Sequence, residues 1–414
     1  MELRIRSAAW SATRVAVTSV VLAASLPVAM SVTVTVAIGV CGCSDPPAPA
    51  GSSGPSVGAG IVTLSAAELA RVPQVLAERR GDQFSRAALV RDNARIFLSL
   101  AEAAADEQLA TAALRALQTT WTHSERYAAQ LQLLTPEYAQ VVALRLQDER
   151  PTVQAAAMQA STKCLLGESP DHTVVAHLVQ LATESPIPAA RYEALEALSQ
   201  SSEIRTHPEQ IAPFVHALDA PEAWLVSGSL LRLVGFGAAW PEQQTLRAAL
   251  RQLLTHADPG VRGRAATTLS SIVGPADAER DDVARALLPL LSDPHPFPRS
   301  AAATALAWLD YRPAVHALVL LLDDPTPDTY DLRGYTRLDG TPGWIHHDGS
   351  PWSRVDDAAL RALQSFSGRV GSRFTFDIQR ERLALDLAAA ARGARDWYAT
   401  VQDQLPPPPL TEAR

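Results

Sequence analysis

A three-residue pattern recurs along this chain and constrains its fold more than any other feature. Each copy has a reference residue, a small residue three positions later and, in all but one copy, a leucine seven positions later, as in Arg299, Ala302 and Leu306. Offsets of three and seven fall on one face of an α-helix. The other copies have their reference residues at Ala110, Gln154, Arg191, Val226, Arg262 and Asp356.

The spacing of these copies predicts a repeat architecture. Reference positions 154, 191, 226, 262 and 299 are separated by 37, 35, 36 and 37 residues. A fixed period of this size is typical of stacked helix pairs, in which neighbours cover the apolar face that no single pair can cover alone. Hydrophobic residues make up 47% of the chain and aromatic residues only 6%, which suits an all-α fold. We therefore predict an all-α solenoid of antiparallel helix pairs.

The turns before the second helices carry a further signal. Asp258-Pro259-Gly260 and Asp293-Pro294-His295-Pro296 each place an acidic residue where a helix N-cap is expected. The prolines fix φ and prevent the preceding helix from continuing. Both sequences therefore predict a tight turn that is followed by a new helix.

These residues together resemble a known family. The motif D-P-x-V-R-x-x-A-x-x-x-L, running from Asp258 to Leu269, is similar to HEAT repeats, especially the short variety of bacterial scaffold proteins and phycobilisome-lyase-type proteins. The resemblance implies a ladder of Asp and Arg side chains along successive turns. Exposed pairs of this kind would contribute about 0–1 kcal/mol each. The residues that fit the ladder are Asp258, Arg262, Asp293, Arg299 and Arg191, whereas Gln154, Val226 and Asp356 interrupt it.

The N-terminus has the organisation of an export signal. Arg4, Arg6 and Arg14 precede a stretch, residues 15–43, without a charged residue. Its end, Val40-Cys41-Gly42-Cys43, resembles the lipobox of bacterial lipoproteins, which implies lipidation of Cys43. Cys41 fits less well because the bulky Val40 precedes it.

Two alternatives stay open for this stretch, an uncleaved membrane anchor and plain secretion. All three interpretations place residues 62–414 outside the cytoplasm. Ser44 after the cysteine favours the outer membrane, by resemblance to better-studied bacterial lipoproteins.

The chain divides by composition and periodicity. Residues 62–147 are expected to open with a capping box at Ser65 and Glu68 and to form helices over residues 86–100 and 107–121. Cys164 is expected to be a buried, inert thiol, and Trp397 a core residue of the last helix. The predicted parts are a signal peptide (1–43), a flexible tether (44–61), a cap with degenerate repeats (62–147), HEAT-like repeats (148–368), a closing segment (369–404) and a disordered Pro-rich tail (405–414).

An insertion interrupts the period near the C-terminus. The gap between reference positions 299 and 356 is 57 residues, and the excess lies in residues 324–352. Asp339-Gly340 favours a small hairpin there. Insertions into a solenoid project from one end of the helix pairs, often on the binding face, and exposed aromatic side chains often anchor interfaces. The candidate interaction residues are Tyr330, Tyr335, Trp344, His346, His347 and Trp352.

The sequence argues against metal binding and nucleic-acid binding. His346 and His347 are adjacent, so an extended chain directs them to opposite sides, and no H-x-x-x-H spacing supplies further ligands. The net charge is −8, and no arginine cluster builds a basic surface. The folded region also lacks a phosphate-binding glycine loop and a nucleophile-elbow motif. No metal, cofactor, nucleic-acid partner or catalytic residue is therefore assigned.

These observations favour a non-catalytic lipoprotein of the cell envelope. Its solenoid would be a scaffold for other envelope proteins, and an N-terminal lipid would hold it at the membrane. One alternative is a metal-dependent or cofactor-handling enzyme that uses the His and Asp residues of the insertion. Another is a lyase-type HEAT protein, although an export signal does not suit the cytoplasmic substrates of that class.

Overall fold

A computed structural model describes most of the chain after the predicted tether. The described residues are 60–80, 83–84, 87–119, 135–165, 171–201, 211–234, 243–328, 334–345, 354–370 and 387–408. The predicted signal peptide, with Cys43, lies outside them, as does all but the end of the tether. None of the described helices is both long and apolar enough to cross a bilayer.

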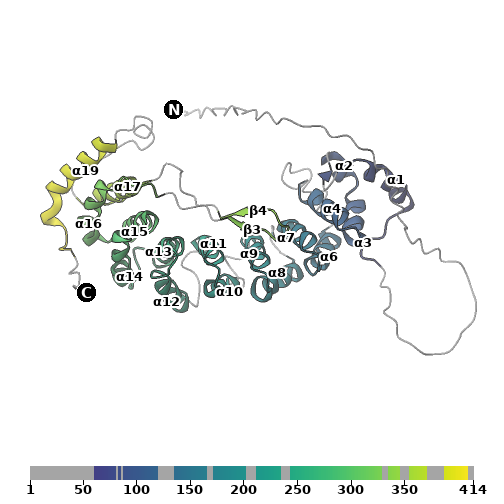
Figure 1. Ribbon diagram of the computed structural model, residues 1–414, viewed down its shortest axis with the longest axis horizontal. Helices are drawn as coiled ribbons and strands as arrows, with labels where there is room; N and C mark the ends of the chain where they lie inside the picture. The colour runs from purple at the N-terminus through teal and green to yellow at the C-terminus, as the bar shows by residue number, and fades with distance from the viewer. Residues whose placement is uncertain are drawn as a thin grey trace, which may run out of the picture. The chain divides into compact units, whose positions relative to one another are not determined.

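Helix pairs follow one another along residues 94–367, as Figure 1 shows. The pairs are α3 (Ala94–Ala103) with α4 (Glu107–Thr119), α6 (Thr135–Leu146) with α7 (Pro151–Leu165), α8 (His172–Glu184) with α9 (Pro188–Leu198), α10 (Ala212–His216) with α11 (Ala223–Leu233), α12 (Gln243–Leu253) with α13 (Pro259–Val273), α14 (Arg280–Leu287) with α15 (Pro296–Trp308), and α16 (Val315–Leu320) with α17 (Val355–Ser367). Each pair packs against its neighbours. The predicted all-α solenoid is confirmed.

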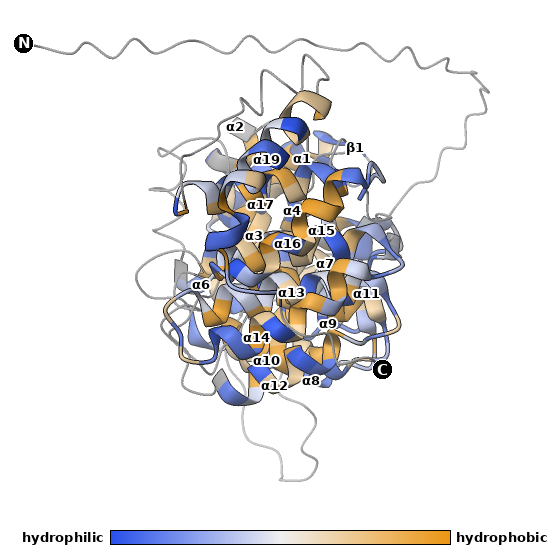
Figure 2. Ribbon diagram, turned by 90° about the vertical axis from the view of Figure 1, so that its left-hand side faces the viewer, coloured by the Kyte–Doolittle hydropathy of each residue, from blue (hydrophilic) through white to orange (hydrophobic). Residues whose placement is uncertain are grey.

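Short 3-10 helices extend several of these elements. They are η2 (Ala217–Asp219), η4 (Leu288–Ser292), η5 (Arg312–Ala314), η6 (Leu321–Asp323) and, after the last helix, η7 (Gln402–Gln404). In Figure 2, hydrophobic and hydrophilic residues occur on the same helices, as expected for elements that bury only one face.

The recurring pattern lies on the second helix of every pair, and these helices contact one another in sequence order. We call α4, α7, α9, α11, α13, α15 and α17 the second-helix row. The small residue and the seventh residue of all seven copies are at most 2% exposed. These residues are Ala113, Leu117, Ala157, Ser161, Ala194, Leu198, Ser229, Leu233, Ala265, Leu269, Ala302, Leu306, Ala359 and Leu363.

Close packing in this row requires a glycine at two positions, Gly228 and Gly263. A Cβ atom on Gly228 of α11 would lie 2.2 Å from the ring of Tyr192 on α9. Glycine therefore lets the two helices approach around the tyrosine ring.

The Asp–Arg ladder forms, but its members are more buried than expected. Arg262 makes a bidentate pair with Asp293, with Nε–Oδ2 and Nη2–Oδ1 distances of 2.7 and 2.8 Å. The two side chains are only 13% and 6% exposed. Nη1 of Arg262 also donates to the carbonyl oxygens of residues 256 and 257. The expectation of a weak, solvated ladder is therefore wrong here, because the guanidinium also satisfies the carbonyl groups of its own turn.

Other ladder positions differ from the expectation in instructive ways. Arg299 pairs with Asp324 at 2.7 Å, which continues the ladder to the start of the insertion. Arg191 instead donates to the carbonyl oxygen of Ala182 at 3.4 Å, and the described residues give it no ion pair. Gln154 donates to the carbonyl oxygen of Leu146 at 2.8 Å, so its amide replaces one of the arginine contacts.

The two acidic turns do not behave alike. Asp258 is the N-cap of α13 and accepts hydrogen bonds from the N–H groups of Gly260 and Val261. Asp293 was expected to cap α15, but the N-cap is His295, whose Nδ1 accepts from the N–H of Phe297. The second proline, Pro296, moves the helix start by two residues and leaves Asp293 to pair with Arg262.

The N-terminal region is a helical cap with one unexpected feature. Ser65 and Glu68 form the predicted capping box of α1 (Ala66–Ala77). The helix predicted over residues 86–100 is divided at Asn93 into α2 (Ala87–Asp92) and α3. Two antiparallel strands of two residues each, β1 (Arg79–Arg80) and β2 (Gln83–Phe84), were not predicted. Phe84 packs edge-on against Phe97 of α3, with ring centroids 4.7 Å apart.

The C-terminal segment closes the stack with α19 (Leu387–Val401). Trp397 is 4% exposed and donates to the carbonyl oxygen of Val370 at 3.2 Å, so its predicted core position is confirmed. The tail was expected to be disordered from residue 405. Leu405 is instead 8% exposed, and the carbonyl oxygen of Pro406 lies 2.9 Å from Nε2 of His316. Apolar burial of Leu405 thus extends the packed structure beyond the predicted boundary.

Cys164 has the environment predicted for an inert thiol. It is 5% exposed, and burial raises the pKa of its thiol to about 12. The reactive thiolate is therefore scarce at neutral pH.

The buried ladder pair gives a test of its energetic weight. Arg262→Gln should lower the free energy of unfolding by about 3 kcal/mol, because Asp293 would be left buried without its cation. Arg285→Gln removes the partner of Asp282 in a pair whose side chains are 59% and 66% exposed, and should cost about 0–1 kcal/mol. Urea unfolding followed by circular dichroism measures both. Equal losses in the two variants would contradict this account.

Candidate functional site

The insertion lies between the two helices of the last pair, after η6 and before α17. Backbone hydrogen bonds close its base. The N–H of Val355 donates to the carbonyl oxygen of Thr326, and the N–H of Asp356 donates to the carbonyl oxygen of Asp324. Pro327 and Arg354 form an antiparallel bridge beside them. The insertion therefore leaves and rejoins the stack at one place, so that α16 and α17 still form a pair.

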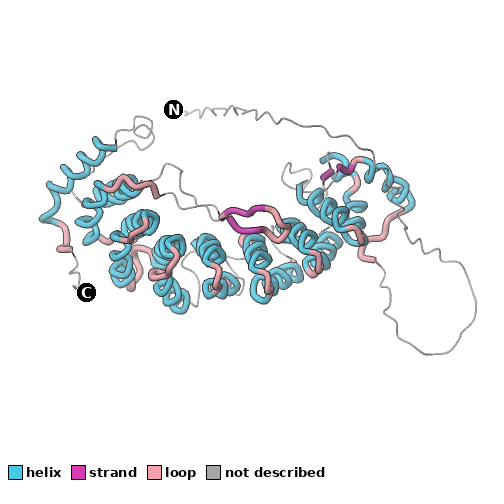
Figure 3. The backbone as a smooth tube through the Cα atoms, viewed as in Figure 1, coloured by secondary structure: helices cyan, strands magenta, loops and turns pink. Residues whose placement is uncertain are grey.

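The predicted hairpin is confirmed. Strands β3 (Gly334–Thr336) and β4 (Pro342–Trp344) pair antiparallel, with Tyr335 opposite Gly343. The turn includes Gly340 at φ 81°, a conformation that favours glycine. Figure 3 shows the two strands beside the helices of the solenoid.

The hairpin packs onto the second-helix row. The ring of Tyr335 stacks on Trp224 of α11, with centroids 4.8 Å apart and planes at 9°. It also meets Tyr192 of α9 edge-on at 5.1 Å. Tyr335 is consequently 8% exposed, and the expectation that this aromatic residue is an exposed interface anchor is wrong. Its hydrophobic area is buried within the protein's own fold.

Polar contacts fix the hairpin turn over residues far away in the sequence. The N–H of Leu338 donates to Oε1 of Glu193 on α9 at 2.8 Å, and Nε of Arg337 lies 3.7 Å from the same oxygen. Arg115 of α4 pairs with Asp339 at 2.9 Å. Burial raises the pKa of Glu193, which is only 3% exposed. Burial also opposes ionisation of Asp339, but hydrogen bonds from Thr341 and the charge of Arg115 hold the pKa of Asp339 below its usual value.

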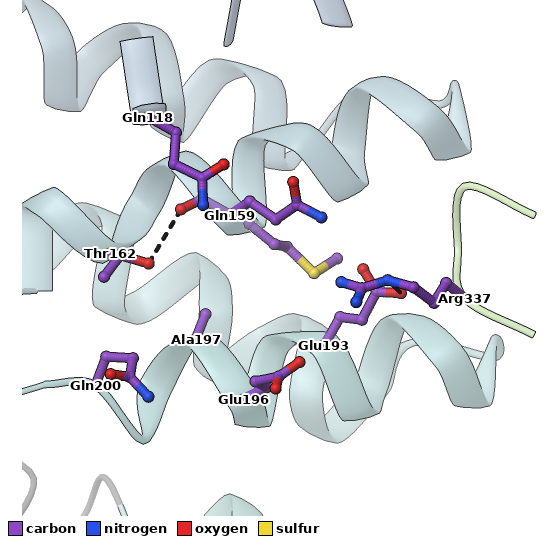
Figure 4. A pocket seen from close by; sticks show the side chains of 9 residues that line it. Gln118, Gln159, Thr162, Glu193, Glu196, Ala197, Gln200 and Arg337 are labelled. Atoms are coloured by element: carbon purple, nitrogen blue, oxygen red, sulfur yellow. Dashed lines mark hydrogen bonds and ion pairs between the residues drawn. The ribbon is translucent and has the colours of Figure 1, made fainter. Parts of the chain in front are cut away.

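A pocket of about 390 Å³ opens where the turn meets α4, α7 and α9. Figure 4 shows Arg337 of the hairpin beside Glu193, with glutamine side chains on the other walls. The lining residues are Gln118, Met158, Gln159, Thr162, Glu193, Glu196, Ala197, Gln200 and Arg337. Glu196 is partly exposed and pairs with Arg232 at 2.9 Å.

The chemistry of this lining is suited to binding. Three carboxamides, two carboxylates and a guanidinium offer hydrogen bonds and charge, while Met158 and Ala197 offer apolar contact. The described lining residues include no His, Cys or Ser, the usual members of a nucleophile–base pair. The hydroxyl of Thr162 donates to the carbonyl oxygen of Gln159 at 3.0 Å.

The other predicted site residues are only partly placed. Trp344 is 54% exposed, as expected for an interface residue. Tyr330, His346, His347 and Trp352 lie outside the described residues. Within the described ranges, no group of three or more potential metal ligands comes together. The interaction role of these five candidates stays a prediction.

Sequence reasoning missed Glu193, although a signal for it was present. Glu193 lies two positions after its reference residue, where Ala112, Ala156, Gly228, Ala301 and Ala358 occur in other copies. Only Glu193 and Arg264 are charged at this position, and both are less than 5% exposed. A charge at a position otherwise held by small residues indicates a specific contact.

The buried carboxyl of Glu193 should give stability a measurable pH dependence. Its raised pKa means that the folded state binds a proton more tightly than the unfolded state, for which the ordinary value is 4.5. The stabilisation from this proton is complete below that value and is lost as pH rises through the folded pKa. The free energy of unfolding of the wild type, minus that of Glu193→Gln, should therefore fall as pH rises above 4.5 and then level off.

Urea unfolding across a pH series measures this difference. Glu149→Gln, which removes an exposed carboxyl, is the control for the loss of one charge. The same downward trend for both variants, or no trend for Glu193→Gln, would contradict the assignment.

Comparisons with known proteins gave one family match and several weaker structural similarities. The model of the HEAT-repeat family matches residues 248–331, which include the second half of α12 and all of α13 to α16. Among solved structures, a designed armadillo repeat protein, YIII(Dq)4CqI, is 19% identical with a TM-score of 0.38, covering 51% of this chain and 98% of that one. Kap121p bound to RanGTP is 16% identical with a TM-score of 0.44, covering 82% of this chain and 38% of that one.

The match spans little more than a third of Kap121p. No curated protein matches the chain. The family match shows HEAT repeats over residues 248–331, and the packing of the helix pairs shows the α-solenoid to which these residues belong.

Proposed function

We propose that this protein is a non-catalytic scaffold that binds another protein through α9 and α11 of the second-helix row and the insertion that lies on them. The observation that carries the proposal is the folding of the hairpin back onto α9 and α11. This packing creates a pocket of polar side chains on a surface built from helices. Solenoids of this kind expose extended surfaces that suit protein partners.

Trp344 supports the same proposal. It belongs to the hairpin that packs on α9 and α11, yet 54% of its surface is exposed. A large aromatic side chain held on an ordered element loses little conformational entropy on binding and is enriched at interface hot spots. We assign it as the leading anchor among the predicted interaction residues.

The proposed location is the cell envelope, with the outer membrane favoured. The support is the basic N-terminus, the uncharged stretch over residues 15–43 and the cysteine at its end. A lipid on Cys43 would hold the scaffold at the membrane, and the Pro-, Gly- and Ser-rich tether would let it reach envelope partners. A retained anchor or secretion would also place the solenoid outside the cytoplasm.

The anchor of partner binding can be tested with a matched pair of tryptophans. Trp344→Ala should lower recovery of crosslinked partners from membranes about tenfold or more, as expected for an interface hot spot. Trp308→Ala is the control, because Trp308 is similarly exposed at 59% but lies at the end of α15. Quantitative mass spectrometry of the affinity-purified complexes gives the ratio. Unchanged recovery with Trp344→Ala would remove the hairpin from the proposed interface.

Lipidation can be tested at the two cysteines. Cys43→Ser should abolish incorporation of a labelled fatty acid, whereas Cys41→Ser should retain it. Metabolic labelling followed by gel electrophoresis distinguishes the two variants. A wild-type chain that stays in membranes without label would identify an uncleaved anchor, and loss of label only in Cys41→Ser would move the modification to that residue.

A further inference from the structure

Glu193 has an unfinished hydrogen-bonding arrangement. Its Oε1 accepts the N–H of Leu338 at 2.8 Å and faces Arg337 at 3.7 Å. Its Oε2 is buried and has no hydrogen-bond partner among the described residues. An unsatisfied buried polar atom costs about 1–3 kcal/mol, and more when the group is charged. A ligand that donates to this oxygen would recover that cost.

The pocket gives such a ligand a place to enter. Glu193 lines the pocket, and its side chain is 2% exposed. The pocket has a volume of about 390 Å³, which is large enough for a long side chain. Arg337 lies on one wall and leaves the rest of this volume free. Met158 and Ala197 supply apolar surface for an aliphatic stem, and Gln159 supplies a carboxamide on another wall of the pocket.

The unpartnered oxygen of Glu193 favours a group that donates a hydrogen bond, and a cation most of all, whereas Glu196 is already paired with Arg232. Glu193 and Glu196 contribute two carboxylates, whereas Arg337 is the one cation among the described lining residues. The whole chain carries a net charge of −8, which attracts basic partners over longer distances. An anionic ligand would have to approach the unpaired oxygen of Glu193 against its charge.

A guanidinium suits this geometry better than an ammonium group. It is planar, presents several N–H donors in fixed directions and is more weakly hydrated, so that its transfer into a partly buried site costs less. It can donate to Oε2 of Glu193 and, on another edge, to a neighbouring carboxylate or carboxamide oxygen. An ammonium group would give up more hydration for the same contact.

We propose that the pocket between α7, α9 and the hairpin turn binds the guanidinium of an arginine side chain that a partner protein presents. This inference rests on the proposed scaffold function and names the chemistry of the partner at one point of the interface. Glu193 makes the central contact, Glu196 contributes at the mouth, and Met158 packs against the stem.

The test uses the full chain in detergent micelles and three capped tripeptides, acetyl-Gly-X-Gly-amide, in which X is arginine, citrulline or lysine. Citrulline has the shape of arginine without its charge. Saturation-transfer NMR titrations measure the affinities. The arginine peptide should bind about tenfold or more tightly than the citrulline peptide, the difference expected for one charge-assisted hydrogen bond. The lysine peptide should bind more weakly than the arginine peptide.

Variants locate the contact. Glu193→Gln keeps an oxygen that can accept the N–H of Leu338 but removes the charge, and it should weaken arginine-peptide binding about tenfold or more. Glu149→Gln, an exposed residue outside the pocket lining, should leave the affinity unchanged. Glu196→Gln is a second variant at a partly exposed position, and it should also weaken binding. Circular dichroism verifies that each variant is folded.

Several results would overturn the inference. They are an arginine peptide that does not bind at millimolar concentration, a citrulline peptide that binds equally well, a lysine peptide that binds equally well, and an affinity unaffected by Glu193→Gln and Glu196→Gln. If Trp344 still governs partner recovery while the arginine peptide fails to bind, the scaffold proposal stands and only the pocket assignment is lost. If the arginine peptide binds but recovery of crosslinked partners does not depend on Trp344, the pocket assignment stands and the assignment of Trp344 as the interface anchor is wrong.

Discussion

Every helix pair of this solenoid depends on its neighbours to cover an apolar face. The small residue and the residue seven positions after the reference are almost fully buried in all the second helices, so the core is one continuous layer between successive pairs. The terminal pairs lack a neighbour on one side. The structure covers them with α1 and α2 at one end and with α19 at the other, where Trp397 packs and donates to Val370. This stacking constraint explains both the regular middle and the irregular ends.

The insertion departs from this nearest-neighbour arrangement. Leu338 contacts Glu193 across 145 positions of the chain, and Arg115 pairs with Asp339 across 224. Contacts within a simple solenoid join only adjacent repeats. The hairpin therefore links the last helix pair to α4 and α9 and fixes a polar pocket between elements that the repeat alone would leave apart. The same contacts bury Tyr335 and leave Trp344 exposed, so two aromatic residues of similar predicted role receive different environments.

Buried charge occurs at a few defined places. Arg262 and Asp293 satisfy each other and the carbonyl groups of a turn, which lets both be buried without an orphaned charge. Glu193 is different, because its contacts with Leu338 and Arg337 use only one carboxylate oxygen. The charged groups of Arg262 and Asp293 are hydrogen-bonded to each other and to the turn, which indicates a structural role for the ladder. Glu193 keeps one buried oxygen without a hydrogen bond beside a pocket, which supports a binding role.

Periodicity and turn chemistry in the sequence were sufficient to predict the helix pairs, the reference positions, the capping box at Ser65 and the hairpin around Gly340, because these depend on residues close together in the chain. The N-cap of α15 was mispredicted because two prolines compete for the helix start. The burial of Tyr335, the continuation of the ladder from Arg299 to Asp324 and the pocket at Glu193 could not be predicted in this way. Each depends on which helices the insertion contacts, and only the folded stack brings those distant side chains together.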